Sequence, residues 1–400
     1  MERSRDITMT TVKNIFEPST SSDPVQRAMD SLSAVRQFQQ DWKDFGTDRV
    51  HRYFDNVDGN WIEEFNKNPV EISISSISKQ LKSLGIPLSL IDTIGFPDWW
   101  HQGLAYNKQE IDRLLDFIAK RFLLSVDFSG NQEPTFDFQE IAGLRFKLKK
   151  NNKDSTLFTR VATGIADDIA SLVSNAYIPI SNNPLYVRDW ILKRSSRINL
   201  DSLLTFCWEH GIAVGHFNIE RKIKGMSKFD GMVAMRDNRP TIIIGSSRKS
   251  EAWLSFILAH ELGHIASGHL HNGVLVDDEF GGGEIDYEET EADNFVTQLL
   301  FGKPSLGWDK KLSFKELYKI ALNLSKQYRI DSGFIVLNYA WHTKDWGISM
   351  AVLKKLEPES NAPVKIYQCL NEYLNQYQHL QNLDTDSRNY LCHMNVLAAA

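Results

Sequence analysis

Cysteine is scarce in this chain of 400 residues, and the three that occur, Cys207, Cys369 and Cys392, are widely spaced. Small secreted domains depend on dense, paired cysteines, so this spacing argues against a disulfide framework. The chain also lacks an apolar run long enough to span a membrane, and its first residues lack the apolar core of a signal peptide. We therefore predict a cytoplasmic protein that uses neither disulfides nor a membrane.

Several catalytic motifs are also absent from the sequence, and one stretch of it lacks positively charged residues. The sequence contains no P-loop, no dinucleotide-binding fingerprint and no serine-hydrolase elbow. Between Lys249 and Lys303 there is no lysine or arginine, whereas eleven aspartates and glutamates occur there. This pattern predicts a negative face that would attract a basic protein substrate, such as a DNA-binding protein. The alternative is that these acids simply cluster around a metal site.

The most specific motif lies within that acidic stretch, in His260-Glu261-Leu262-Gly263-His264. On a helix, the two histidines lie one turn apart on the same face, so both imidazoles can reach one metal ion. Glu261 is rotated by about 100° from them, close enough to hold a metal-bound water without being a ligand. The residues around the motif are strongly apolar, which predicts that this helix is buried.

Two histidines do not complete a catalytic zinc site, which usually takes three protein ligands and one water. The metzincin spacing fails, because Leu270 stands where the third histidine of that pattern would be. His269 and His271 are close in sequence, but we expect them to lie off the ligand face or beyond the end of the helix. The third ligand must therefore come from another element.

The better candidates are the acids of a second helix, in Glu288-Glu289-Thr290-Glu291-Ala292-Asp293. With Glu289 set at zero, Asp293 lies at about 40°, on the buried face, whereas Glu291 projects at about 200°, toward solvent. We predict Glu289 as the third ligand, with Glu291 as the alternative, and Asp293 as the carboxylate that orients a ligand imidazole. Glu288 and Glu291 are otherwise explained as acids that favour the start of a helix.

The predicted chemistry is peptide hydrolysis. Zn²⁺ lowers the pKa of its bound water and polarises the scissile carbonyl, and Glu261 passes a proton from the water to the leaving amine. Tyr339 and His342 are candidates to stabilise the oxyanion, with plain packing as the competing interpretation. Met232–Met235 and Thr241–Ile244 predict a β-hairpin whose edge strand could bind an extended peptide.

The region from about Asp201 to Gly302 resembles the ImmA/IrrE family of zinc-dependent metallo-endopeptidases. The matching pieces are, in order, Gly211–Val214, Pro240–Ile244, His260–His264, Gly268-His269-Leu270 and Glu289–Phe295. The resemblance implies a zincin-like domain with Glu289 as the third ligand. It also implies cleavage of a DNA-binding repressor or antitoxin in a stress-response, mobile-element or phage-defence setting. Longer members carry a Cro-like helix-turn-helix ahead of the peptidase, and Ile74–Ile86 is similar to the start of one.

DNA binding by this N-terminal region is a separate question. A recognition helix normally presents basic or amide side chains to the DNA. The candidate here, Pro87–Ile94, has no basic residue, and Pro69–Gly130 holds six basic against seven acidic residues. The only basic cluster nearby, Arg145 to Lys153, is interpreted as a solvated loop. We expect a regulatory module that contacts proteins, and DNA binding stays an open alternative.

The predicted fold class is α+β: a zincin-like peptidase domain, with its active-site helix against a small β-sheet, flanked by mainly α-helical regions. The predicted divisions are a disordered tail over 1–24, a helical, helix-turn-helix-like regulatory domain over 25–150, connecting helices over 151–200, the peptidase domain over 201–302 and a helical C-terminal region over 303–400.

Two functions from different classes fit these observations. The leading hypothesis is a zinc endopeptidase with a narrow intracellular protein substrate. The rival is a regulatory protein that binds DNA or a partner and uses its zinc domain as a sensor or scaffold. Glu261 favours the enzyme, because a structural zinc site has no need of a general base. A homo-oligomer is compatible with either hypothesis.

Overall fold

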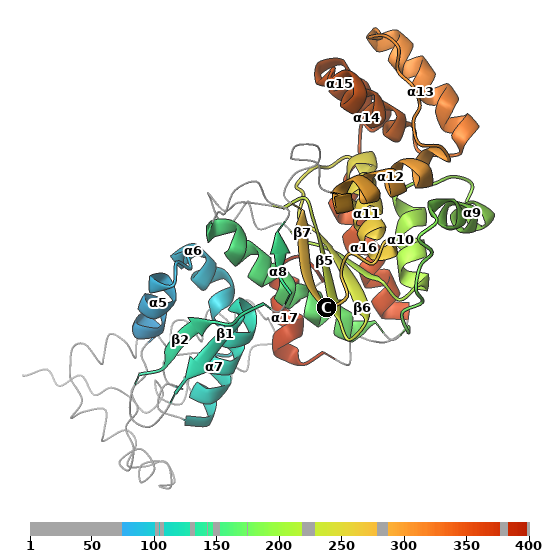
Figure 1. The fold of residues 1–400 in the computed structure, drawn as a ribbon. Coiled ribbons are helices and arrows are strands. Elements are labelled where there is room, and N and C mark those ends of the chain that lie inside the picture. Colours follow the sequence, from blue (N-terminus) through green and yellow to red (C-terminus); the bar gives the residue numbers. More distant parts are fainter. Residues whose placement is uncertain are drawn as a thin grey trace, which may run out of the picture. The chain divides into compact units, whose positions relative to one another are not determined.

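The computed structural model describes residues 74–100, 104, 108–128, 133–141, 143–146, 153–173, 175–217, 229–277, 287–376 and 383–397. These residues form an α+β fold with a five-stranded sheet (Figure 1). The mixed class predicted from the sequence is confirmed. The predicted tail over 1–24, and the predicted regulatory domain as far as residue 73, lie outside the described residues.

The larger sheet mixes parallel and antiparallel pairs in the order β3-β7-β5-β6-β4. Its strands are β3 (Arg145–Phe146), β4 (Ala213–His216), β5 (Gly231–Arg236), β6 (Arg239–Ile244) and β7 (Gly273–Asp277). β5 pairs antiparallel with β6 and β7, whereas β4 and β3 run parallel to β6 and β7. Asp237 and Asn238, both at positive φ, make the two-residue turn between β5 and β6, so the predicted hairpin is confirmed.

The hairpin does not lie at an edge of the sheet, and that part of the prediction is wrong. β5 lies between β7 and β6, and β6 lies between β5 and β4, so the backbone groups of both strands face partners on both sides. A peptide that adds a strand would need one of the outer strands, β4 or β3. Because β3 lies at 145–146, the sheet also draws on residues before the predicted peptidase boundary at 201.

Two long helices cover the two faces of this sheet, α8 (Lys153–Leu172) and α11 (Glu251–Ala266). A Cβ added at Gly215 in β4 would touch α8, whereas one added at Gly231 in β5 would touch α11. Gly215 pairs with Ile243 and Gly231 with Ile244. Since neighbouring residues of a strand point to opposite faces, α8 and α11 lie on opposite faces of the sheet.

The segment before β4 shows how local sequence sets an element boundary. α10 (Leu200–Glu209) begins at a capping box formed by Asn199 and Ser202. Gly211 follows it in the left-handed region (φ 71°), where a Cβ would lie 2.6 Å from the Ala176 carbonyl oxygen. The chain then enters β4 directly. Upstream, α9 (Pro184–Arg194) completes the predicted connecting helices.

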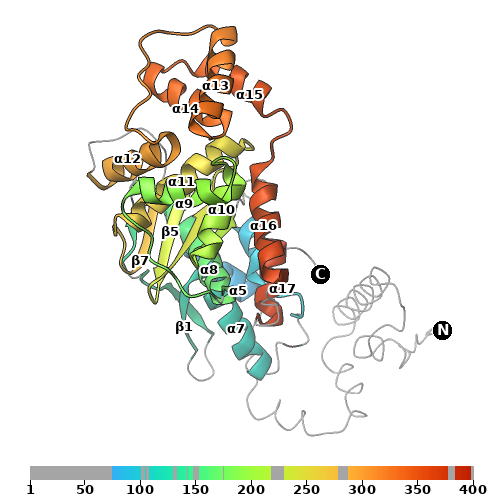
Figure 2. The same cartoon turned by 90° about the vertical axis from the view of Figure 1, so that its right-hand side faces the viewer.

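The C-terminal region is helical, as predicted. Its described elements are α13 (Phe314–Tyr328), α14 (Ser332–Thr343), α15 (Trp346–Leu356), α16 (Ala362–Gln376) and α17 (Thr385–His393). Ser313 and Glu316 form a capping box at the start of α13. α16 runs beside α10 and contacts β4 (Figure 2). None of the helices within the described residues is both long and apolar enough to cross a membrane.

The described N-terminal part is less helical than predicted. The expected helix, turn and helix are present as α5 (Ile74–Ser83), a left-handed Gly85, and α6 (Leu88–Leu90) continued by the π-helix η1 (Ile91–Gly95). After α7 (Lys108–Phe122), however, β1 (Leu124–Asp127) and β2 (Thr135–Phe138) form an antiparallel hairpin. With β3 in the larger sheet, the prediction of a helical region over 25–150 is wrong for these three strands.

Candidate metal centre

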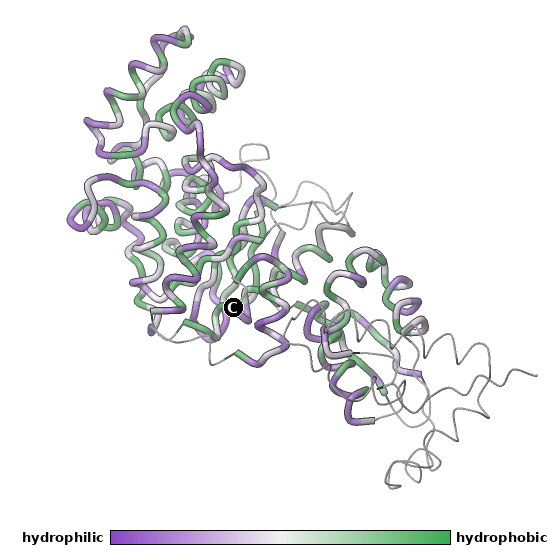
Figure 3. Tube along the Cα trace, turned by 180° about the vertical axis from the view of Figure 1, so that it is seen from behind, coloured by the Kyte–Doolittle hydropathy of each residue, from purple (hydrophilic) through white to green (hydrophobic). Residues whose placement is uncertain are grey.

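The first two ligand candidates lie on α11, which is buried along nearly its whole length. Ser250 caps its start by accepting a hydrogen bond from the Trp253 backbone N–H. Fourteen of its 16 residues are buried. Figure 3 colours the chain by hydropathy and shows hydrophobic residues along both the helices and the strands. His260 and His264 are 2% and 0% exposed, and their Nε2 atoms face each other at 3.0 Å. The predicted one-turn spacing therefore brings both imidazoles to one point.

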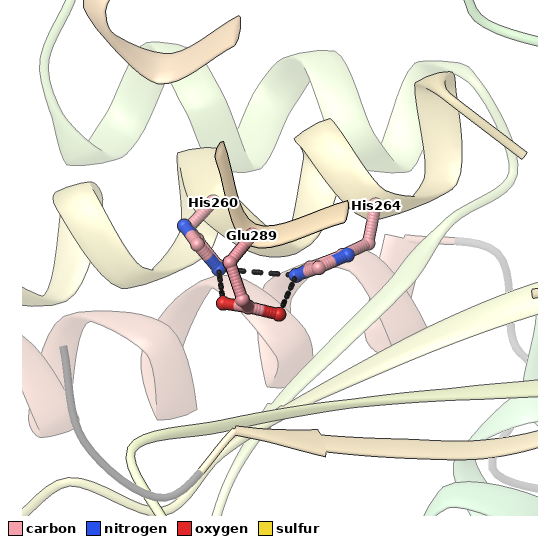
Figure 4. Close-up of side chains that lie close together, drawn as sticks. All are labelled: His260, His264 and Glu289. Atoms are coloured by element: carbon pink, nitrogen blue, oxygen red, sulfur yellow. Dashed lines mark hydrogen bonds and ion pairs between the residues drawn. The ribbon is translucent and has the colours of Figure 1, made fainter. Parts of the chain in front are cut away.

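The third candidate comes from α12 (Tyr287–Phe301), which crosses α11 at close range. A Cβ added at Gly263 would lie 3.0 Å from the Ala292 Cα, so the glycine inside the motif lets the two helices approach. This crossing places Glu289 Oε2 3.2 Å from His260 Nε2 and Oε1 3.5 Å from His264 Nε2 (Figure 4). His260, His264 and Glu289 thus form a group that could hold a metal ion.

The separations within the group fit a tetrahedral zinc site. Ligand atoms about 2.0–2.1 Å from zinc, at tetrahedral angles, are about 3.3–3.4 Å apart. The three observed separations are 3.0, 3.2 and 3.5 Å. Two imidazoles and one carboxylate also form a donor set that zinc accepts in catalytic sites with a fourth position for water. Both the geometry and the chemistry of the residues therefore fit this metal.

Asp293 contacts the imidazole of His260 from its outer side. Its Oδ1 lies 3.1 Å from His260 Nδ1, which is the contact expected from the helical spacing on α12. The expected burial of Asp293 is wrong, because its side chain is 58% exposed. A carboxylate only accepts hydrogen bonds, so it holds the His260 proton on Nδ1 and leaves the Nε2 lone pair to face Glu289.

Glu261 is fully buried on the side of α11 that faces the sheet. Its carboxylate lies directly against Gly231, the first residue of β5, in the space that a Cβ there would occupy. A side chain at position 231 would therefore displace the carboxylate. The general base predicted from the motif has its place secured by a glycine that sequence reasoning did not single out.

Sequence reasoning also did not predict a second chain of contacts, which runs from His264 through His269 to Glu291. His264 Nδ1 lies 2.8 Å from His269 Nδ1, and His269 Nε2 lies 2.9 Å from Glu291 Oε2. The expectation that Glu291 points only to solvent is wrong, although its side chain is 43% exposed. His269 lies beyond the end of α11, as expected, and is not part of the group of three. The sequence signal for the contact between His269 and His264 is Gly268, because a glycine after a helix predicts a cap that folds the next residue back.

Arg145 secures this second chain from β3. Its guanidinium donates to the His269 carbonyl oxygen and pairs with both oxygens of Glu288, at 3.1 Å each. Interpreting Arg145 as part of a solvated loop, and Glu288 as only a helix-start acid, is therefore wrong. The lysines at 147, 149 and 150 lie outside the described residues.

The two oxyanion candidates have different surroundings. The Tyr339 hydroxyl is buried and accepts a hydrogen bond from the Leu312 backbone N–H at 2.7 Å. His342 is exposed near the end of α14. The oxyanion role stays a prediction for both.

Comparison with known proteins found no relative of this chain. No family model matches the chain, and neither a curated protein nor a solved structure matches it.

Proposed function

We propose that this chain is a zinc-dependent endopeptidase of the ImmA/IrrE type. The observation that carries the proposal is the convergence of two buried imidazoles and one carboxylate from α11 and α12, with Glu261 next to one of the imidazoles in the chain. When bound, zinc would supply Lewis acidity: it polarises a carbonyl group and lowers the pKa of water.

The residues of the chain would divide the remaining work. His260, His264 and Glu289 hold the metal, and Asp293 keeps the lone pair of His260 turned toward it. Glu261 accepts a proton from the attacking water and passes it to the leaving amine. The packing of α11 holds Glu261 against Gly231, so the base is positioned before a substrate arrives.

The substrate class follows from charge and from the family resemblance. The stretch between Lys249 and Lys303 has eleven acidic and no basic residues, which favours a basic partner. A DNA-binding repressor or antitoxin in the cytoplasm, in a stress-response or phage-defence setting, has that character. The rival DNA-binding function has less support, because Leu88–Gly95, which follows the turn at Gly85, contains no lysine or arginine.

The proposal is tested by profiling new protein N-termini in cells that express the full chain, with and without DNA damage or phage challenge. We expect wild type to generate new termini that Glu261→Gln does not, since glutamine cannot act as a base. The exposed His271 offers a matched control, because His271→Gln changes a neighbouring histidine outside the site. Identical termini in wild type and Glu261→Gln under every condition would contradict the proposal.

A further inference from the structure

The two ligand histidines are oriented in different ways. His260 contacts a carboxylate directly, through Nδ1 and Asp293 Oδ1 at 3.1 Å. His264 instead contacts a second imidazole, which in turn contacts the Glu291 carboxylate, at 2.8 and 2.9 Å. The chain Glu291–His269–His264 joins α12 to the end of α11 by a route separate from Glu289.

The proton positions in this chain follow from counting donors. The Glu291 carboxylate can only accept, so the proton of a neutral His269 must lie on Nε2. His269 Nδ1 then carries a lone pair and must accept from His264 Nδ1–H. A neutral His264 with its proton on Nδ1 has a lone pair on Nε2, which is the atom that faces Glu289. One carboxylate thus sets the tautomer of two histidines in succession.

His269 is held from its backbone as well as from its ring. The backbone N–H groups of Gly268 and His269 donate to the carbonyls of Ile265 and His264, at 3.2 and 3.1 Å, in a Schellman cap at the left-handed Gly268. Arg145 donates to the His269 carbonyl oxygen from β3. The backbone of His269 is therefore held in place, which keeps its imidazole next to that of His264.

On the basis of the proposed zinc site, we propose that His269 and Glu291 are positioning residues that fix His264 as an Nε2 metal ligand. With Asp293 acting on His260, the three groups that meet at the centre then all present lone pairs. Acceptors 3.0 to 3.5 Å apart repel one another unless a cation lies between them, so the two carboxylates prepare the group for a metal.

The test measures the zinc dissociation constant of the full chain by competition with a chromophoric chelator. We expect His269→Ala and Glu291→Ala each to weaken binding, by about 10–100-fold for His269→Ala. His269→Asn should recover part of the loss, because its amide oxygen can still accept from His264 Nδ1–H. His271→Ala, which changes an exposed histidine two residues away, should bind zinc like wild type.

A double-mutant cycle separates this chain of contacts from general damage. If Glu291 acts only through His269, the double variant should bind zinc no more weakly than His269→Ala alone. In zinc-loaded protein labelled with ¹⁵N-histidine, the His264 Nδ1–H proton should be a slowly exchanging signal that His269→Ala removes and His269→Asn keeps. Circular dichroism of the zinc-free variants checks that each one is folded.

The outcomes distinguish this proposal from the proposed function. Zinc binding by wild type that His269→Ala leaves unchanged, or additive losses in the cycle, would overturn the positioning role and leave the zinc site standing. Failure of the wild-type chain to bind zinc would instead overturn the proposed function, and the positioning role with it.

Discussion

α11 and α12 meet at the candidate metal centre but are held in different ways. Fourteen of the 16 residues of α11 are buried, whereas only six of the 15 residues of α12 are buried. α11 packs against the sheet, α10, α12 and α14, so its two histidines and Glu261 are fixed by the core. The side chain of Glu289 is 31% exposed, so its position depends mainly on how α12 lies against α11. The site therefore combines a rigid half with a half that can shift at lower cost.

The largest expected effect comes from a substitution in α11, the rigid half of the site. His264→Ala should abolish stoichiometric zinc binding, because it removes a fully buried imidazole and leaves one histidine in the group. Glu289→Ala should lower zinc affinity less, because water can take the place of a partly exposed carboxylate. Metal analysis of the purified variants measures both. Full zinc content in Glu289→Ala would show that Glu289 is not a required ligand.

The next effect concerns the base rather than the metal. Gly231→Ala puts a Cβ into the space of the Glu261 carboxylate, so peptidase activity should fall by a factor on the order of 10²–10⁴ while zinc is kept. Zinc content and turnover are measured on the same preparation. Gly347→Ala is the matched control, because a Cβ there has no heavy atom within 4 Å. Wild-type turnover in Gly231→Ala would show that the position of Glu261 is not critical.

A smaller effect tests the crossing of the two helices. Gly263→Ala places a methyl group 3.0 Å from the Ala292 Cα, which should push α12 outward and destabilise the protein by about 1–3 kcal/mol. Zinc affinity should fall as well, because Glu289 moves away with α12. Chemical denaturation and chelator competition give the two values. An unchanged zinc affinity would mean that the distance between the helices does not control the site.

The last effect lies at the other end of α11, away from the metal centre. Glu357 accepts a hydrogen bond from the Ala252 backbone N–H at 3.0 Å, and burial raises its pKa to about 7 from an ordinary 4.5. Between these values the folded state keeps a proton that the unfolded state has lost. Stability should therefore fall as the pH rises through this window, by at most about 3 kcal/mol.

Glu357→Gln should flatten this part of the dependence of stability on pH, since glutamine keeps an acceptor for Ala252 and does not titrate. Thermal melts of both proteins from pH 4 to pH 8 compare them. The same slope in wild type and Glu357→Gln would assign the dependence to other groups.

The division between the helices also explains what could be predicted from the sequence. His260, Glu261 and His264 follow from the spacing within one helix, and Glu289 and Asp293 follow from the angular positions along another. These are local properties. The contact of Glu291 with His269 depends on the crossing of α12 over α11 and on the reversal at Gly268, so helical angles alone assigned Glu291 to solvent.

The strands also differ in whether the local sequence predicts them. The hairpin of β5 and β6 consists of two short runs of mainly apolar residues joined by a short polar turn, and both features are visible in the sequence. β3 has only two residues, and its partner β7 is far away in the chain, so no periodicity in the sequence predicts this strand. The role of Arg145 depends on that pairing and could not be inferred from the local sequence, in which it looks like one more basic residue.

The most direct test of the central claim is X-ray absorption at the zinc edge on the full chain loaded with one equivalent of zinc. We expect a four-coordinate site of nitrogen and oxygen ligands at about 2.0–2.1 Å, with the scattering pattern of two imidazoles. Glu261→Gln should leave this spectrum in place, and His264→Ala, which removes one of the two imidazoles, should abolish it. Failure to retain zinc, a sulfur ligand, or a spectrum that His264→Ala does not alter would contradict a site built from His260, His264 and Glu289.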